Sequence, residues 1–262
     1  MQRLFALPLT LLLLAQLVLL GLMSLAWNAL AVLLYLLLPR ELSVAVGRKG
    51  ISYGYRAFWA IAARIGMLRL DAGVLDALRD EPGLIIVANH PSLLDAPMLV
   101  ARLPRSACIM KAELMRNPFL GAGARLARYI RNDSPRRMVR RAVQDLQRGG
   151  QLVLFPEGTR TMQRPLNPFR PGVTLIAKLA QAPIQAVFID TDSPYLGKGW
   201  PVWRLPPLPI EFSVRLGERF APAEDSDALL VQIERYFAAG LRTPVQPASA
   251  QPRPLARTSR GR

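Results

Sequence analysis

The sequence predicts an α/β domain, with helices packed over a sheet, behind an apolar N-terminal segment. Short strand-like apolar runs recur along the chain, with helical patterns between most of them, as in α/β proteins. Leucine dominates the segment from Leu4 to Pro39, which carries no charged residue. The expected strands are residues 84–88, 107–110, 152–155, 186–190 and 210–216.

Residues 1–40 are expected to be a retained hydrophobic membrane anchor. A helix of about 35 residues reaches about 52 Å, beyond a hydrocarbon core of about 30 Å, whereas two full spans need about 20 residues each. We therefore expect a long tilted helix or a broken pair of helices partly immersed, with Gly21, Ser24 and Asn28 as bend positions. A cleaved signal peptide is the alternative, but its apolar region is usually only about 7–15 residues.

Residues 41–70 predict an interfacial amphipathic helix, because aromatic and basic residues alternate between residues 53 and 70. An ordinary amphipathic helix packed on the domain fits the same pattern, and both interpretations stay open. Basic residues are far more numerous after the apolar segment than before it, where Arg3 stands alone. The positive-inside tendency therefore predicts an inner-membrane protein with its main domain on the cytoplasmic side. The basic residues after the segment are Arg40, Arg48, Lys49, Arg56 and Arg64.

The one histidine of the chain, His90, follows an apolar run and lies five residues before Asp95. The unperturbed pKa of histidine, about 6.5, suits it to proton transfer near neutral pH. A carboxylate commonly fixes its tautomer. Asp95 also has a structural interpretation, since Ser92-x-x-Asp95 resembles a helix capping box.

A second polar turn, residues 155–160, follows the apolar run 152–154. Ligands of open α/β sheets bind beyond the carboxyl ends of the strands, so the two turns are expected to meet at one crevice. Gly158 permits a positive φ, Glu157 can accept from a hydroxyl, and Arg160 suits a phosphate. A tight turn with a solvated arginine is the structural alternative.

These motifs resemble the glycerolipid acyltransferase family, of the 1-acylglycerol-3-phosphate acyltransferase type. His90-x4-Asp95 resembles its His-x4-Asp block, and Glu157 to Arg160 matches its Glu-Gly-Thr-Arg block. The resemblance covers roughly residues 70 to 220 and implies a mixed sheet flanked by helices, with residues 71–242 as the acyltransferase domain. Further matches are Lys111-Ala112-Glu113-Leu114, Arg131, the segment 169–172 and the segment 182–187, in which Ala186 stands where the family usually has proline.

The resemblance implies a membrane-bound enzyme that moves an acyl group from acyl-CoA or acyl carrier protein to a lysophospholipid hydroxyl. His90 would be the general base and Asp95 its orienting partner. The turn formed by Glu157, Gly158 and Thr159 would supply oxyanion donors. Lys111, Arg131 and Arg160 would hold the phosphate of lysophosphatidate, the default acceptor. Another lyso-lipid, such as an aminolipid or glycolipid, and a catalytically silent membrane-binding relative remain alternatives.

The remaining composition limits other classes of function. The single cysteine, Cys108, lies in an apolar run and is expected to be buried rather than nucleophilic. One His and one Cys cannot form a zinc cluster, so we expect no metal and no cofactor besides the acyl-thioester co-substrate. The net charge of +16 is dispersed and follows an apolar anchor, which favours anionic lipids over nucleic acid as the partner.

Three further segments complete the prediction. Residues 136–147 are expected to form a helix that ends at Gly149-Gly150. The proline-rich loop 193–209 carries Tyr195, Trp200 and Trp203, which could rest at the lipid interface or pack on the domain. Residues 243–262 are expected to be a disordered basic tail.

Overall fold

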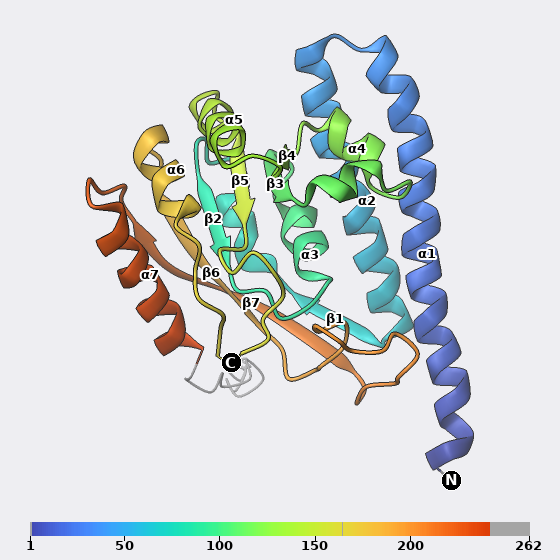
Figure 1. Ribbon diagram of the computed structural model, residues 1–262. Helices are drawn as coiled ribbons and strands as arrows, with labels where there is room; N and C mark the ends of the chain where they lie inside the picture. Colours follow the sequence, from blue (N-terminus) through green and yellow to red (C-terminus); the bar gives the residue numbers. More distant parts are fainter. Residues whose placement is uncertain (1, 164, 242–262) are drawn as a thin grey trace, which may run out of the picture.

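The computed structural model describes residues 2–163 and 165–241, and it contains a seven-stranded mixed sheet flanked by helices (Figure 1). The predicted α/β class is therefore confirmed. The strand order is β1-β7-β6-β2-β5-β3-β4. The strands are β1 Leu68–Asp71, β2 Ile85–Ala88, β3 Ser106–Met110, β4 Ile130–Arg131, β5 Gln151–Leu154, β6 Ile184–Asp190 and β7 Ile210–Phe220.

Five neighbouring strands, in the order β6-β2-β5-β3-β4, run parallel to one another. β7 is antiparallel to β6, and β1 pairs in parallel with β7 at the edge. Every residue of β2 and β5 is buried, which explains why both read as continuous apolar runs in the sequence. The carboxyl ends of the five parallel strands therefore face one edge of the sheet, where both sequence motifs lie.

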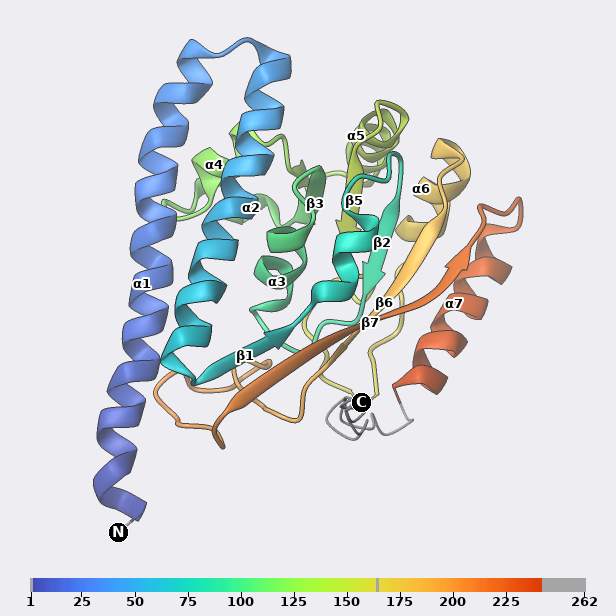
Figure 2. The same ribbon diagram turned by 180° about the vertical axis from the view of Figure 1, so that it is seen from behind.

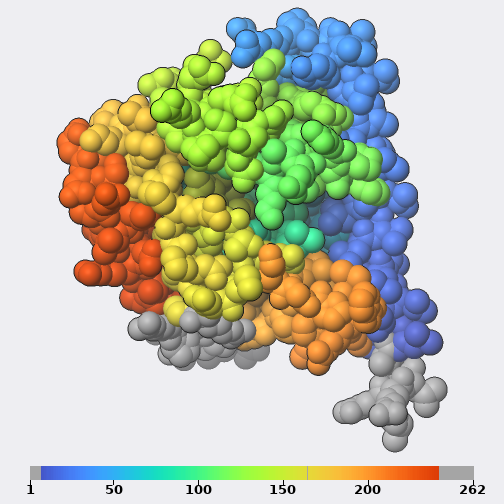
Figure 3. Space-filling view, in the orientation of Figure 1, coloured from blue at the N-terminus to red at the C-terminus, as the bar shows by residue number. Residues whose placement is uncertain are grey.

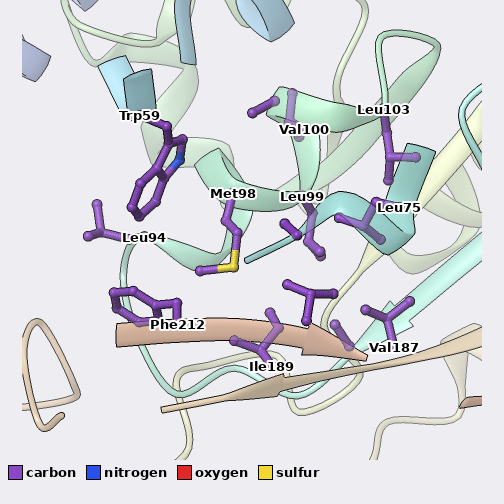
Figure 4. Close-up of a cluster of buried hydrophobic side chains, with 14 of the residues drawn as sticks. Trp59, Leu75, Leu94, Met98, Leu99, Val100, Leu103, Val187, Ile189 and Phe212 are labelled. Atoms are coloured by element: carbon purple, nitrogen blue, oxygen red, sulfur yellow. The ribbon is translucent and has the colours of Figure 1, made fainter. Parts of the chain in front are cut away.

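Helices cover the two faces of the sheet over separate hydrophobic clusters. Ile86 and Ala88 of β2 join the cluster under α3 Asp95–Arg102, which includes Met98 and Trp59 (Figure 4). Ile85 joins the opposite cluster, because neighbouring residues of a strand point to opposite faces. That cluster lies under α5 Pro135–Gln147, α6 Gly172–Ala180 and α7 Ser226–Gly240 (Figure 2).

The N-terminal segment forms two antiparallel helices, α1 Gln2–Leu37 and α2 Arg40–Ile65, joined by a turn at Pro39 (Figure 1). α1 continues as one helix through Gly21, Ser24 and Asn28, in agreement with the expected long helix and not with a broken pair of helices. Asn28 instead docks the short helix α4 Gly121–Leu126: its Oδ1 accepts from Ala122 N at 2.7 Å and Gly123 N at 2.9 Å. The polar residue in the anchor is thus explained by a helix cap.

Within α1, the 31 residues Leu7–Leu37 are long and apolar enough to cross a membrane. Only 11% of the most apolar stretch is buried against the domain, unlike the core helix of a soluble protein. Large apolar side chains are exposed along its whole length, from Leu7 to Leu37. α1 is therefore a candidate membrane anchor.

α2 packs between α1 and the domain. Of the two interpretations of residues 41–70, the aromatic face of α2 therefore agrees with a helix packed on the domain. Phe58 and Trp59 are buried in the core cluster. The predicted helix to residue 70 was wrong at its end: Gly66 adopts φ +82°, its N–H bonds Ala62 O, and β1 begins at Leu68. A left-handed glycine is a common helix terminator.

Arg48, one of the basic residues that follow the anchor, is an internal tie rather than a lipid-facing charge. Its guanidinium bonds the Asp145 carboxylate of α5 at 2.6 Å, Arg105 O at 2.8 Å and Ala127 O at 3.2 Å. The side chain is buried. This residue therefore joins the helical hairpin to the domain. The expected tail, residues 243–262, lies outside the described residues.

Candidate active site

His90 lies directly beyond the carboxyl end of β2, on a backbone that Asn89 holds in place. The Asn89 amide donates to Ile189 O at 2.8 Å and accepts from Ile189 N at 2.8 Å. Asn89 is buried, and its two hydrogen bonds to β6 extend the pairing of β2 with β6 by one residue beyond the end of β2. The position of His90 is therefore fixed by the sheet.

The imidazole of His90 bonds the carboxylate of Asp95 at the first residue of α3. His90 Nδ1 lies 2.7 Å from Asp95 Oδ2, and the same oxygen accepts from Ser92 N at 2.8 Å. Asp95 thus orients the histidine and also closes the turn at the start of α3. Asp95 can therefore be both the partner of His90 and part of the helix capping box, as the two interpretations of the sequence proposed.

Burial controls the protonation of Asp95, whose side chain is fully inaccessible to solvent. Burial raises the pKa of Asp95 to about 6, while the hydrogen bond and charge of His90 oppose this rise. The imidazole stacks on Phe155, with ring centroids 4.1 Å apart. Since Nδ1 is occupied, and Nε2 has no hydrogen-bond partner among the described residues, Nε2 is the nitrogen available to a substrate.

Glu157 braces the loops around His90. Its Oε1 accepts from His90 N at 3.0 Å and from Thr161 Oγ1 at 2.8 Å, and its Oε2 accepts from Asn167 N at 2.9 Å. Thr161 N in turn donates to His90 O at 2.7 Å. Because both oxygens of this buried carboxylate bond protein groups, Glu157 ties the two sequence motifs together. Direct contact of Glu157 with a substrate stays a prediction.

Gly158 closes a tight turn at φ +69°, and its N–H donates to Phe155 O at 3.0 Å. That N–H is therefore occupied, whereas the amides of Thr159 and Arg160 have no partner among the described residues. A Cβ at position 158 would lie 2.4 Å from Arg170 Nε. Both the backbone angle and the close side chain require glycine here.

Arg160 connects the second motif to the loop after β6. Its Nη1 donates to Leu196 O at 2.7 Å and to Gly197 O at 3.0 Å, which leaves its other nitrogens for a ligand. Lys198, in the same loop, lies 3.3 Å from Thr159 Oγ1. Arg160, Lys198 and Arg170 together form a cationic rim on one side of the turn.

Lys111 and Arg131 lie beyond β3 and within β4, at the same edge of the sheet as His90. Arg131 pairs with Met110 across the parallel strands and forms an ion pair with Asp133. A pocket of about 330 Å³ opens beside it and is lined by Ala112, Glu113, Met115, Arg116, Arg125 and Arg131. Three of the six residues that line this pocket are therefore arginines.

The sheet therefore brings the predicted residues together as a row at one edge, since β2, β5, β3 and β4 are consecutive neighbours. His90 and Asp95 touch directly, and Glu157 bonds the His90 backbone. Lys111 and Arg131 occupy the far end of this row. Cys108 is buried in β3, where burial raises the pKa of its thiol to about 12, which disfavours a nucleophilic thiolate.

Two contributors to this site were not identified from the sequence. Asn167 accepts from Met162 N and Gln163 N, each at 3.1 Å, and so shapes the loop after Arg160. The stacking of Phe155 on His90 was also missed. No short-range spacing links these residues to the histidine, because the sheet topology creates the contacts. Among the described residues, no group of three His, Cys, Asp or Glu side chains could hold a metal ion.

Comparison with known proteins agrees with this architecture. Residues 71–190 match the family model described as Acyltransferase. The chain is 31% identical over 152 residues to a lyso-ornithine lipid O-acyltransferase of Pseudomonas aeruginosa, covering 53% of this chain and 58% of that protein. It is 27% identical over 183 residues to a 1-acyl-sn-glycerol-3-phosphate acyltransferase of Limnanthes douglasii, covering 67% and 63%.

The structural comparison concerns the fold. The crystal structure of the 1-acyl-sn-glycerophosphate acyltransferase of Thermotoga maritima superposes with a TM-score of 0.68 at 22% identity. The match covers 92% of this chain and 97% of that chain. The similarity in fold therefore extends beyond residues 71–190 to nearly the whole chain. In the sequence comparison, the chain spans less than two thirds of the length of each of the two relatives above.

Proposed function

We propose that this chain transfers a fatty acyl group from a thioester to the hydroxyl of a lysophospholipid, because residues 71–190 match the family model described as Acyltransferase. The observation that carries the proposal is the His90–Asp95 pair, which leaves Nε2 open at a sheet edge rich in arginine and lysine. A base beside cationic groups suits an acceptor that has both a hydroxyl and a phosphate.

In the proposed mechanism, the acceptor hydroxyl donates its proton to His90 Nε2 as its oxygen attacks the thioester carbonyl. Asp95, bonded to Nδ1, keeps Nε2 unprotonated in the resting state and stabilises the imidazolium that forms. Collapse of the tetrahedral intermediate breaks the C–S bond, and the imidazolium returns the proton to the leaving thiolate. The products are the diacyl lipid and the free thiol of the carrier.

The developing oxyanion needs donors that the fold has not already used. The N–H of Gly158 bonds Phe155 O, so this amide is a poor candidate. We assign the role to the backbone amides of Thr159 and Arg160, which follow it in the same turn. The reaction then needs no metal and no cofactor beyond the acyl-thioester co-substrate.

The cationic groups suggest how the two substrates are held. The strand that carries His90 and the strand before Lys111 are two strand spacings apart, roughly 10 Å. A glycerophosphate headgroup and an extended lysine or arginine side chain together can span this gap. We therefore assign the acceptor phosphate to Lys111, Arg131 and Arg160, and lysophosphatidate is the first acceptor to test.

A lyso-aminolipid is the second candidate acceptor, because one relative is named a lyso-ornithine lipid O-acyltransferase. Such an acceptor has no phosphate, so it would not need Arg131. The donor is acyl-CoA or acyl carrier protein. We place the enzyme at the inner membrane, held by α1, with its domain on the cytoplasmic side.

The test is acyl transfer in detergent with a panel of lyso-lipids and both thioester donors. Wild type should acylate lysophosphatidate, and Arg131→Ala should raise the KM for this acceptor by about tenfold or more, since a charged hydrogen bond contributes about 1.5–3 kcal/mol. Arg69→Ala, at an exposed ion pair away from the site, is the matched control. Product with lyso-ornithine lipid alone would keep the mechanism and change the acceptor. If folded protein forms no product with any combination of donor and acceptor, the proposed acyltransferase activity is refuted.

A further inference from the structure

The helix α5 and the residue that caps its C-terminus together carry five arginines, all of them exposed, and a single acidic residue, Asp145. Asp145 is already bonded to the buried Arg48. One of the five, Arg137, lies 3.5 Å from Asp133, and the other four form no ion pair within the part of the chain that the structure describes. The five arginines are Arg136, Arg137, Arg140, Arg141 and Arg148.

These charges oppose the folding of α5. Arg136 and Arg140, like Arg137 and Arg141, are like charges four residues apart, which destabilise a helix. Arg136 and Arg137 also lie in the first turn, where the helix dipole favours acidic residues and α5 has none. An anionic partner bound along α5 would remove both penalties. The charge pattern therefore favours a role in binding over a role in stability.

Arg128, which follows α4, occupies an unfavourable backbone position. Its φ of +54° lies in the left-handed region, where the residue after a helix is usually glycine. A residue held in such a conformation costs stability that has to be compensated elsewhere. The Arg128 side chain is exposed and forms no ion pair within residues 2–163 and 165–241. Within these residues, its charge therefore offers no compensation for the strained backbone.

The buried side chain of Arg48 fixes where α5 lies against α4. Its guanidinium bonds Ala127 O at the end of α4 and the carboxylate of Asp145 on α5. Arg141 and Arg148 lie four residues before and three residues after Asp145, so they share its face of α5. These two arginines therefore flank the point at which α4 meets α5.

Arg128 directly follows that point, and Arg40 lies about two helical turns before Arg48 in α2. Partial burial, and then the positive charges of Arg40, Arg141 and Arg148, lower the pKa of Arg128. The four guanidinium groups are therefore close enough to repel one another, although they come from three segments of the chain. We refer to Arg40, Arg128, Arg141 and Arg148 as the arginine cluster.

α5 lies away from the apolar helix α1. In both views of the fold, α2 and α4 lie between α1 and α5 (Figures 1 and 2). Figure 3 shows α5, in yellow-green, as an uncovered surface beside the green residues of α4. The exposed apolar side chains of α1 are therefore not part of this surface, which suits a partner that arrives from water.

The surface also leads to the candidate site. α5 begins four residues after Arg131, at the edge of the sheet that carries His90. β4, which ends at Arg131, lies three strand spacings from β2, roughly 15 Å. An extended phosphopantetheine arm can span this distance. The arginines between residues 136 and 148 extend over roughly 18 Å of helix, which suits the side of an acidic helix better than a single phosphate group.

We propose that α5 and the arginine cluster form the docking surface for acyl carrier protein, an acidic helical protein that presents the thioester donor. This docking deepens the proposed acyl transfer, on which it rests, because it names the donor. Carboxylates of the carrier pair with guanidinium groups that have no acidic partner in the described chain, and the complementary charges accelerate the encounter. The carrier's prosthetic arm then enters the site from the side of β4.

Two substitutions test this surface without removing a contact that the fold needs. Arg128→Gly places glycine at φ +54° and removes one like charge, so the free energy of unfolding should not fall. Arg141→Gln removes a second charge and keeps a good helix former. Arg235→Gln, the same exchange at an exposed arginine of α7, is the matched control.

Binding would be measured by the fluorescence anisotropy of labelled holo-acyl carrier protein added to the full chain in detergent. We expect Arg128→Gly with Arg141→Gln to weaken binding by about fivefold or more, and Arg235→Gln to change it by less than about twofold. Unchanged binding by the double variant, or equal weakening by the control, would overturn the proposal. This measurement requires no acyl transfer, so a failure of the proposed function would be recognised separately.

Activity at low donor concentration would then compare palmitoyl-acyl carrier protein with palmitoyl-CoA. We expect the double variant to lose about fivefold in kcat/KM with the carrier protein and less than about twofold with palmitoyl-CoA. Equal loss with both donors would overturn the docking and assign the cluster to the phosphate that both carriers share. Weaker sedimentation with phosphatidylglycerol vesicles at unchanged carrier binding would overturn it in favour of anionic lipid.

Discussion

Replacing Asp95 with asparagine tests the catalytic pair without removing its hydrogen-bonding shape. In the wild type, Oδ2 accepts from His90 Nδ1 and Ser92 N, while Oδ1 has no partner among the described residues. Asparagine can retain both accepted bonds through its amide oxygen. It loses the negative charge that stabilises an imidazolium, and it can also select the wrong tautomer by donating to Nδ1. We expect kcat to fall by about three to four orders of magnitude while the protein stays folded.

The same variant should change the pH dependence of stability. The folded pKa of Asp95, about 6, lies above its ordinary value of 3.8, so the folded state binds more protons than the unfolded state between these pH values. The contribution of Asp95 to the free energy of unfolding of the wild type is therefore fully present below pH about 4 and is lost as the pH rises through 6. The loss is on the order of 3 kcal/mol, and Asp95→Asn should lack it. The amide N–H₂ that replaces Oδ1 is buried without an acceptor, which costs about 1–3 kcal/mol at every pH.

The assays are steady-state acyl transfer at pH 7.5 and denaturant unfolding of both proteins at pH 4.5 and 7.5. In wild type, kcat should also fall as the pH drops below about 6, because protonated Asp95 no longer stabilises the imidazolium. If the stability difference between the two proteins is the same at both pH values, the raised pKa is refuted. If Asp95→Asn retains wild-type kcat, the orienting role is refuted instead.

Three further substitutions test the scaffold of the site and of the anchor. Glu157→Gln should lower the free energy of unfolding by about 1–3 kcal/mol in chemical denaturation and reduce kcat, because an NH₂ group replaces an oxygen that accepts from a backbone N–H. Unchanged values would refute the role of Glu157 in holding the two loops together. Gly158→Ala should lower activity at least tenfold because of its φ of +69° and the Arg170 contact, whereas Gly54→Ala, in an open stretch of α2, should not. Arg48→Met should lower the unfolding free energy by about 3–5 kcal/mol, since it leaves its partner carboxylate unpaired, while Arg69→Met should change it by less than about 1 kcal/mol.

Sequence patterns identified the central sheet well and its edges poorly. The runs 84–88 and 152–155 are apolar throughout because β2 and β5 are buried on both faces. β4 has only two residues, Ile130 and Arg131, too few to show a period. β1 begins within the residues predicted as helix 41–70, because the left-handed Gly66 ends α2 at Ile65. The hairpin of α1 and α2 was not predicted, because apolar length and charge indicate an anchor and a following helix but not the turn at Pro39 that makes them antiparallel.

The site shows the same division between local and long-range information. The pairing of His90 with Asp95 follows from a spacing of five residues at a helix start, so sequence alone predicted it. The position of Glu157 in its motif was also evident, but its partners were not. Asn167 and the backbone of His90 reach Glu157 only because β2 and β5 are neighbours in the sheet. The sequence therefore predicted the candidate reacting groups His90 and Asp95, but it did not predict the groups that hold them in place.

In the proposed mechanism, His90 activates an acceptor hydroxyl for acyl transfer. The most direct test is product formation from labelled acyl thioester and lysophosphatidate with wild type beside His90→Ala, each shown to be folded by the same thermal unfolding. We expect turnover by wild type and a loss of at least a hundredfold in kcat for His90→Ala, because general-base catalysis contributes about 10²–10⁴-fold. Equal turnover by the two proteins would refute His90 as the base and assign the proton transfer to another group.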